Sequence, residues 1–190
     1  MKRMHNPVHL VLGDDEFLAE RATKEIIADV GPNAEVATLR ASEVTEGEIA
    51  QATSPSLFAE DRIVVVKNTE LAGKEPTATL LQACVDPAPG MTMIIQHTGG
   101  GRQKQMVPKF QKIAQTHQVN ALKERDRHAW VAKEFQRHGA RPTPDVVAAV
   151  LESVGSDLRE LASAVSQLVA DTEGEITVAA VRDYYTGVAE

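Results

Sequence analysis

The sequence predicts an α/β fold, a parallel five-stranded sheet flanked by helices, followed by a small all-helical domain. Strand-like and helix-like segments alternate as far as Leu122, which is typical of parallel strands joined by right-handed helical crossovers. Residues 63–66 are four consecutive β-branched apolar residues, the pattern of a strand buried on both faces. Only helical patterns follow the charged segment 123–127. We therefore expect one domain over residues 1–123 and a second over residues 124–190.

The first domain is expected to begin with a strand, a tight turn and a helix. The strand ends at Gly13, and Asp14 or Asp15 can cap the next helix because a carboxylate accepts hydrogen bonds from the free N–H groups of its first turn. Gly31 and Pro32 end that helix. The five strands are predicted at residues 8–12, 34–39, 62–66, 91–95 and 118–122.

Three further helices connect the remaining strands. Thr45 and Glu48 have the spacing of a capping box, which predicts a short helix ending at Ala52. Apolar periodicity predicts the other two helices at residues 77–85 and 106–114.

The second domain is expected to contain four short helices. The first has an apolar face made by Trp130, Val131 and Phe135, and Gly139 ends it. The expected starts of the other three are Thr143 before Pro144, Ser156, and Thr177.

Composition excludes several classes of protein. The chain has 190 residues, of which 43% are hydrophobic and 25% charged, as in an ordinary globular protein. The single cysteine, Cys84, allows no disulfide within the chain and is expected to be a buried core residue. No signal peptide is visible, and no apolar run reaches the ~18 residues of a membrane helix. We therefore expect a cytoplasmic protein without a membrane partner.

Charge is unevenly distributed along the chain. The net charge of -7 argues against a surface that binds nucleic acid everywhere. The segment 87–123 nevertheless contains no acid. Its basic residues include four candidates for contact with DNA or with another subunit: Arg102, Lys104, Lys109 and Lys112.

The turn after the first strand lacks the features of a phosphate loop. Such a loop needs glycines, a lysine for the β- and γ-phosphates, and a hydroxyl for magnesium. Here Gly13 is followed by Asp14, Asp15 and Glu16, whose carboxylates would repel a triphosphate. Metalloprotease and serine-hydrolase motifs are also absent from the sequence. We therefore predict no catalytic residue, no cofactor and no metal ligand.

The segment between the short helix and the third strand contains two adjacent large apolar residues. Pro55 keeps the backbone extended ahead of Leu57 and Phe58. The pair can pack inward, or it can dock into an apolar pocket on a partner, where each side chain would contribute about 1.5–3 kcal/mol. The sequence alone does not decide between inward packing and docking to a partner.

Four stretches, in order along the chain, resemble the delta subunit of the bacterial DNA polymerase III clamp loader. They are residues 11–18, 56–66, 125–135 and 155–161. The resemblance implies an AAA+-like α/β domain with a degenerate phosphate loop, a small helical lid domain and a C-terminal collar domain. We expect the collar to be absent, because this sequence ends soon after Tyr185.

The resemblance also implies a function in DNA replication. A delta subunit binds one protomer of the sliding clamp (the beta subunit) and holds the ring open for loading onto primed DNA, without hydrolysing ATP itself. The clamp-binding element corresponds to Pro55, Ser56, Leu57 and Phe58. The implied partners are the clamp, the gamma/tau and delta prime subunits, and primed DNA. DNA-directed DNA polymerase activity would belong to the whole holoenzyme.

Two alternatives come from other classes of protein. The chain could be a DNA-binding module that uses the basic region 102–123 or the helices after Thr143. It could also be a diverged nucleotide-binding domain without hydrolysis, supported by Gly13 and by the glycine run 99–101.

Overall fold

The computed structural model describes residues 6–55, 57, 61–173 and 175–186. The chain forms two compact units, Met1–Ala121 and Leu122–Glu190.

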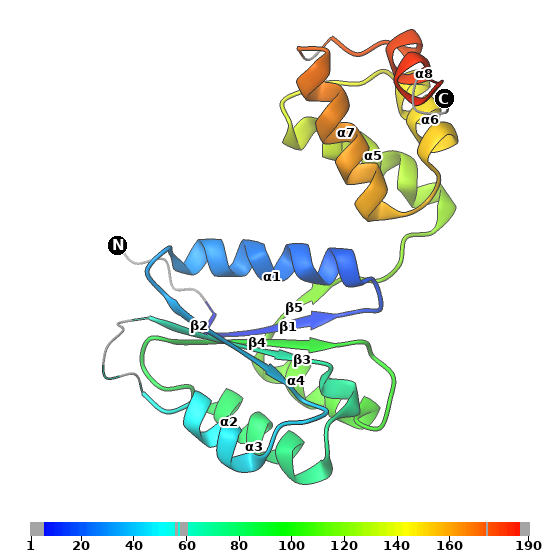
Figure 1. Ribbon diagram of the computed structural model, residues 1–190. Coiled ribbons are helices and arrows are strands. Elements are labelled where there is room, and N and C mark those ends of the chain that lie inside the picture. Colours follow the sequence, from blue (N-terminus) through cyan, green and yellow to red (C-terminus); the bar gives the residue numbers. More distant parts are fainter. Residues whose placement is uncertain (1–5, 56, 58–60, 174, 187–190) are drawn as a thin grey trace. The chain divides into compact units, whose positions relative to one another are not determined.

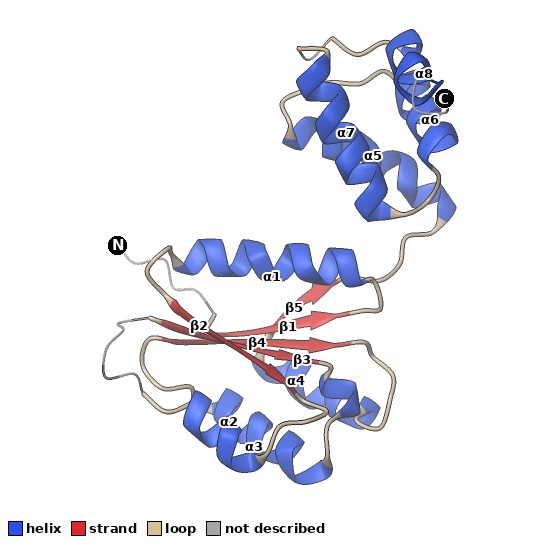
Figure 2. Cartoon of the chain, viewed as in Figure 1, coloured by secondary structure: helices blue, strands red, loops and turns tan. Residues whose placement is uncertain are grey.

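The first unit is built on a five-stranded parallel sheet with the strand order β2-β3-β4-β1-β5, which confirms the predicted fold class (Figures 1 and 2). The strands are β1 (Val8–Leu12), β2 (Glu35–Arg40), β3 (Arg62–Lys67), β4 (Met91–His97) and β5 (Gln115–Gln118). Because the strands are parallel, their carboxyl ends lie at one edge of the sheet, where ligands of open α/β sheets usually bind.

The predicted position of the fifth strand, residues 118–122, is wrong. β5 is Gln115–Gln118, and it pairs with β1 in the register His9↔Gln115 to Leu12↔Gln118. This edge strand is polar throughout, so the alternation of apolar and polar residues that marks half-buried strands is missing. The first apolar residue after it, Val119, is buried, and its N–H donates to the carbonyl oxygen of Leu12 at 2.9 Å.

Helices cover both faces of the sheet. α1 (Glu16–Val30) lies on one face, and α2 (Glu46–Ala52), α3 (Lys74–Val85) and α4 (Val107–Ile113) lie on the other (Figure 1). Two short 3₁₀ helices, η1 (Thr69–Leu71) and η2 (Lys104–Met106), lie in the connections after β3 and β4. The predicted caps are present: Asp15 accepts a hydrogen bond from the Leu18 N–H at 2.8 Å, and Thr45 and Glu48 form a capping box.

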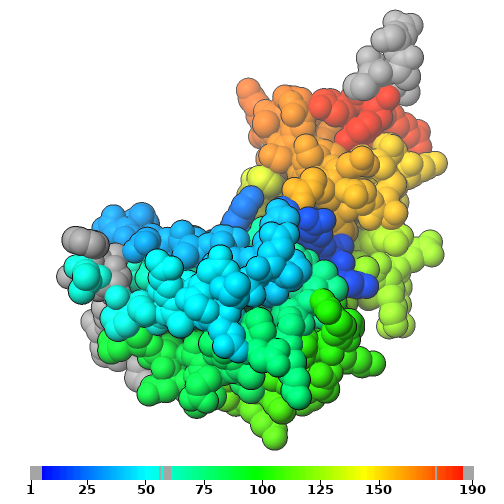
Figure 3. Space-filling model, turned by 60° about the horizontal axis from the view of Figure 1, so that its bottom comes forward, coloured from blue at the N-terminus to red at the C-terminus, as the bar shows by residue number. Residues whose placement is uncertain are grey.

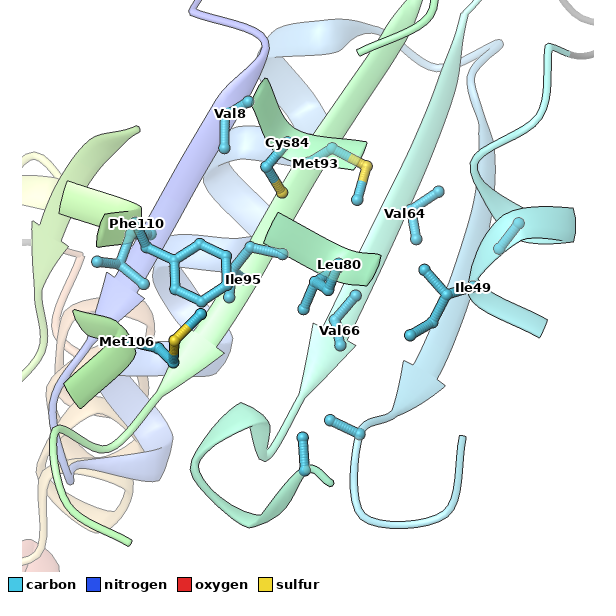
Figure 4. Packing of buried hydrophobic residues seen from close by; sticks show 14 of the residues in the cluster. Val8, Ile49, Val64, Val66, Leu80, Cys84, Met93, Ile95, Met106 and Phe110 are labelled. Carbon is cyan, nitrogen blue, oxygen red and sulfur yellow. The ribbon is translucent and has the colours of Figure 1, made fainter. Parts of the chain in front are cut away.

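Alternate residues of the strands fill two separate cores. Ile63 and Val65 point toward α1, where they pack in one cluster with Ile26. Val64 and Val66 point to the opposite face and belong to a larger cluster (Figure 4). In that cluster Leu80 and Cys84 of α3 and Phe110 of α4 pack against Met93 and Ile95. Cys84 is buried as predicted, and burial raises the pKa of its thiol to about 12.

The described part of the second unit contains four helices, in agreement with the predicted number. They are α5 (Glu124–Arg137), α6 (Pro144–Val154), α7 (Leu158–Asp171) and α8 (Val178–Thr186). The predicted cap Ser156 is wrong: α7 begins one residue later than expected, and the carboxylate of Asp157 accepts a hydrogen bond from the Glu160 N–H at 2.9 Å. Across the described residues, no helix has the length and apolar character needed to cross a membrane.

Candidate functional site

An open pocket of about 320 Å³ lies at the carboxyl ends of β1, β3 and β4. This is the place where a nucleotide would bind if the turn after β1 were a phosphate loop. Lys67 is the only lysine or arginine among the described residues of its lining. The lining also contains five carboxylates, those of Asp14, Asp15, Glu16, Glu20 and Glu70. The balance of charge therefore disfavours a triphosphate.

The backbone of the turn after β1 is also occupied. Gly13 N–H donates to the carbonyl oxygen of His97 at 3.0 Å, and Asp15 N–H donates to the carbonyl oxygen of Val119 at 3.0 Å. The side chain of Asp14 accepts a hydrogen bond from the Ala121 N–H at 2.9 Å. A phosphate loop works by directing free N–H groups at the phosphate oxygens, and two of these groups are already used inside the fold.

No metal-binding cluster is found in the described parts of the chain. Groups of three or more His, Cys, Asp and Glu side chains in an arrangement that could hold a metal ion do not occur there. The carboxylates after β1 have other roles, since Asp15 caps α1 and Asp14 fastens the segment that leaves β5.

The connections after β3 and β4 are joined by a buried polar cluster, which we call the loop junction (Glu70, His97 and Gln103). Gly99 N–H donates to His97 Nδ1 at 2.8 Å, so the proton of the neutral ring is on Nε2, which donates to the carbonyl oxygen of Gln103 at 3.2 Å. Burial lowers the pKa of His97, against smaller opposing effects of the Gln103 carbonyl and the Glu70 carboxylate. The ring is therefore held in its neutral form.

Two further contacts close the loop junction. The Gln103 N–H donates to the carbonyl oxygen of Glu70 at 3.3 Å, and the Glu70 carboxylate accepts from the Thr98 N–H at 3.3 Å. Gly101 has φ 70°, and a Cβ there would lie 2.6 Å from the carbonyl oxygen of Glu70. Gly101 thus permits close packing of the two connections.

Four residues of the pocket and the loop junction were not predicted from the sequence: Lys67, Glu70, His97 and Gln103. A usable signal was present for two of them, because Lys67 and His97 end neighbouring parallel strands, whose carboxyl ends must lie close together. Gln103 had no such signal, since its role depends on a loop conformation.

The predicted clamp-binding element lies between α2 and β3. Its described residues, Pro55 and Leu57, precede β3 in the chain, whereas the pocket lies at the carboxyl ends of the strands. The Leu57 residue is 90% exposed and Pro55 is exposed. Ser56 and Phe58 lie outside the described residues. Arg62 Nη1 donates to the carbonyl oxygen of Ser54 at 3.3 Å and so ties the start of the segment to β3.

All four basic residues predicted to contact DNA or another subunit are exposed, but they differ in their positions and in their contacts within the chain. Arg102 donates to the carbonyl oxygen of Leu71 at 2.6 Å and therefore supports the connection after β3. Lys104 lies in η2, and Lys109 and Lys112 lie on the exposed side of α4. η2 and α4 lie on the side of the sheet that α3 also covers (Figure 1). Figure 3 shows the first unit with this side brought forward.

Comparisons with known proteins agree with this architecture. The family model described as "DNA polymerase III, delta subunit" matches residues 9–122. The Bacillus subtilis DNA clamp loader delta protein has a similar structure, with a TM-score of 0.75 and 17% sequence identity, over 93% of this chain and 57% of that chain. The Thermotoga maritima RuvB Holliday junction branch migration motor is less similar, with a TM-score of 0.55 and 12% identity, over 92% of this chain and 60% of that chain. A search of curated protein sequences found no significant match.

Proposed function

Because the chain belongs to the DNA polymerase III delta subunit family, we propose that it binds the sliding clamp and holds the ring open for loading onto primed DNA. The observation that carries this proposal is the 90% exposure of Leu57 within the proposed clamp-binding element, which consists of Pro55, Ser56, Leu57 and Phe58. The chain spans 57% of the Bacillus subtilis delta protein, so the activity and partners of a whole delta subunit are part of the proposal.

An exposed leucine on a connecting segment is suited to docking. Val36, Leu71 and Val85 are the other exposed large hydrophobic residues in the described part of the chain, with exposures of 43% to 57%. Transfer of Leu57 into an apolar pocket would remove almost its whole side chain from water and would sacrifice few contacts within the chain. Pro55 restricts the backbone ahead of it, which lowers the entropy lost on binding.

The energy for ring opening would come from binding. A ligand shifts a conformational equilibrium only by its difference in affinity for the two states, and moving a population from 1:99 to 99:1 requires about 5.5 kcal/mol. Burial of Leu57 and Phe58 would supply roughly 1.5–3 kcal/mol each. The free energy gained by burying these two side chains is therefore of the right order for ring opening. This requires that their pocket favours the open ring and that neighbouring contacts supply the rest of the affinity.

The acidic turn after β1 is consistent with a subunit that does not use ATP itself. Two of its N–H groups are occupied, and its carboxylates would repel phosphate. ATP chemistry would then belong to other subunits of the loader. A fluorescent ATP analogue is expected to show no saturable binding to the isolated chain.

The decisive experiment measures binding of the sliding clamp from the same organism by calorimetry. Replacing Leu57 and Phe58 together by alanine should weaken binding at least about a hundredfold, because two side chains worth roughly 1.5–3 kcal/mol each are removed. The single variant Leu57→Ala should keep the melting temperature of the original chain, because Leu57 is exposed. Val36→Ala, an exposed apolar position on β2, is the matched control and should bind normally. Unchanged affinity of the double variant would refute the proposal.

Binding of DNA is the second candidate function, and the exposure of Arg102, Lys104, Lys109 and Lys112 in an acid-free segment favours it. A salt-dependent mobility shift of primed DNA by the isolated chain would support this candidate. In an assembled loader, the same residues could contact primed DNA while Leu57 contacts the clamp.

A further inference from the structure

A groove of about 470 Å³ separates α3 from the segment that runs through η2 into α4. Among the residues that line it are Lys74, Ala78, Leu81, Val85, Met106 and Lys109. Its volume lies within the roughly 300–1,000 Å³ of pockets that enclose small ligands. We call it the α3–α4 groove; it is separate from the pocket at the carboxyl ends of the strands.

The α3 side of the groove is an apolar stripe that the core uses only in part: Leu81 is half-buried and packs against the core cluster, whereas Ala78 and Val85 are exposed. Ala78, Leu81 and Val85 recur at helical spacing on one face of α3. The opposite face, which includes Leu80 and Cys84, already packs against the sheet (Figure 4). Val85 is 57% exposed, so its apolar surface remains in water in the free chain.

The facing wall is held in place by the core of the first unit. Met106 and Phe110 belong to the same buried cluster as the α3 residues that contact the sheet (Figure 4). Phe110 is fully buried and Met106 is 9% exposed. Both walls are therefore fixed before a partner arrives, which reduces the cost of ordering on binding. The methionine adds a side chain that adapts to different apolar shapes.

The groove is basic on a chain whose net charge is -7. Lys74 lies at the start of α3 and Lys109 lies on α4. None of the described lining residues is Asp or Glu, and the whole segment 87–123 is free of acids. An apolar groove with lysines on both walls is complementary to apolar side chains flanked by carboxylates.

We propose that the α3–α4 groove binds an acidic peptide segment of a protein partner, with the apolar side chains of that segment lying between α3 and α4. Its Asp and Glu residues would then pair with Lys74 and Lys109. This inference concerns a second surface and does not depend on clamp binding through Leu57. Nucleic acid fits the groove less well, because a phosphate backbone would satisfy the lysines and leave the apolar surface of Leu81 and Val85 without a partner.

The test selects a phage-displayed library of short random peptides against the whole chain. We expect enriched peptides to combine Asp or Glu with Leu, Ile, Phe or Met, and to bind more weakly as salt increases. Fluorescence anisotropy with the best synthetic peptide should show that Val85→Gln and Lys109→Glu each weaken binding about tenfold, which is 1.4 kcal/mol. Both positions are exposed, so circular dichroism should show unchanged folding.

Matched substitutions elsewhere separate the groove from general effects. Val36→Gln on β2 and Lys24→Glu on α1 change the same residue types at exposed positions and should leave peptide affinity unchanged. Leu57→Ala should also leave it unchanged, so failure of clamp binding and failure of this proposal can be distinguished.

Three results would overturn the proposal. The first is an enriched set of peptides without acidic residues, or no enrichment at all. The second is a best peptide whose affinity is unaffected by Val85→Gln. The third is a single-stranded DNA oligonucleotide that binds more tightly than any selected peptide and responds to Lys109→Glu but not to Val85→Gln; that pattern would assign the lysines to nucleic acid.

Discussion

The backbone conformation of the turn after β1 depends on a single residue, Gly13. A Cβ on this residue would lie 2.3 Å from the carbonyl carbon of Val119, which is a backbone atom, and its φ of 150° is rarely adopted by other residues. The glycine therefore serves the close approach of two chain segments within the fold. The same residue type in a phosphate loop would leave space for a ligand.

Gly13→Ala is expected to lower the free energy of unfolding by at least about 2 kcal/mol, because backbone must move to relieve the contact. Urea unfolding followed by circular dichroism measures this. Gly47→Ala is the control: Gly47 lies in α2, and the nearest atom that its Cβ would meet is the Thr45 hydroxyl oxygen at 4.0 Å. That variant should be as stable as the original chain or more stable by up to about 1 kcal/mol. Equal stabilities of the two variants would contradict this account.

Site residues could be predicted from the sequence where the local chain indicates their role. Asp15 is an example, since its place after the first strand predicted a helix cap and it caps α1. The assignment of Pro55, Ser56, Leu57 and Phe58 to clamp binding came from the resemblance to a family and stays a prediction. The loop junction could not be predicted, because Glu70 and Gln103 are 33 positions apart and meet only when the connections after β3 and β4 fold against each other. The exposure of Leu57 likewise depends on the tertiary structure, and the sequence alone left it open.

At the scale of elements, α2 is a short helix that relies on its amino-terminal cap. Glu48 N–H donates to Thr45 Oγ1 at 3.3 Å, and Thr45 N–H donates to Glu48 Oε2 at 2.7 Å. The Thr45 hydroxyl also donates to Glu48 Oε2 at 2.9 Å, and the hydrogen bonds that this carboxylate accepts from the Thr45 N–H and hydroxyl lower the pKa of Glu48. The proposed clamp-binding element begins at Pro55, three residues after the end of α2.

Thr45→Ala should destabilise the chain by about 1 kcal/mol, the usual effect of losing a cap side chain. Thermal and urea unfolding at neutral pH would measure the loss. Ser42→Ala removes an exposed hydroxyl three residues earlier, outside the helix, and should change stability by less than about 0.5 kcal/mol. Similar effects of both substitutions would show that the capping box does not stabilise α2.

The strands differ in how far their sequences specify them. β3 and β4 are almost entirely buried, and their continuous apolar runs made them predictable. β5 consists of Gln115, Thr116, His117 and Gln118, and its strand conformation comes from pairing with β1. An edge strand of this kind is specified by its neighbour in the sheet, so local periodicity placed it three residues too late.

At the scale of the whole molecule, each unit has its own hydrophobic core. In the second unit the core contains Phe135 of α5, Val150 of α6, Leu161 and Val165 of α7, and Val181 of α8, all of which are fully buried. These side chains come from within residues 122–190. The fold class and the number of helices were predictable at this scale because alternation and periodicity extend over many residues.

The fragment of residues 122–190 is therefore expected to fold on its own. Its ¹H–¹⁵N NMR spectrum should contain dispersed signals that superimpose on those of the same buried residues in the intact chain. Phe135→Ala is the destabilising control and should lower stability by about 3–5 kcal/mol. A spectrum typical of an unfolded chain for the original fragment would show that this core needs the first unit.

Cys84 has a practical consequence for experiments on this chain. Its thiol is the only one in the sequence, and its raised pKa of about 12 leaves almost no thiolate at neutral pH. A maleimide dye should therefore leave the folded chain unlabelled. In Ser54→Cys the new thiol would be the single labelled position, because Ser54 is exposed and lies just ahead of the proposed clamp-binding element. The fluorescence of the attached dye would report whether a clamp covers this segment.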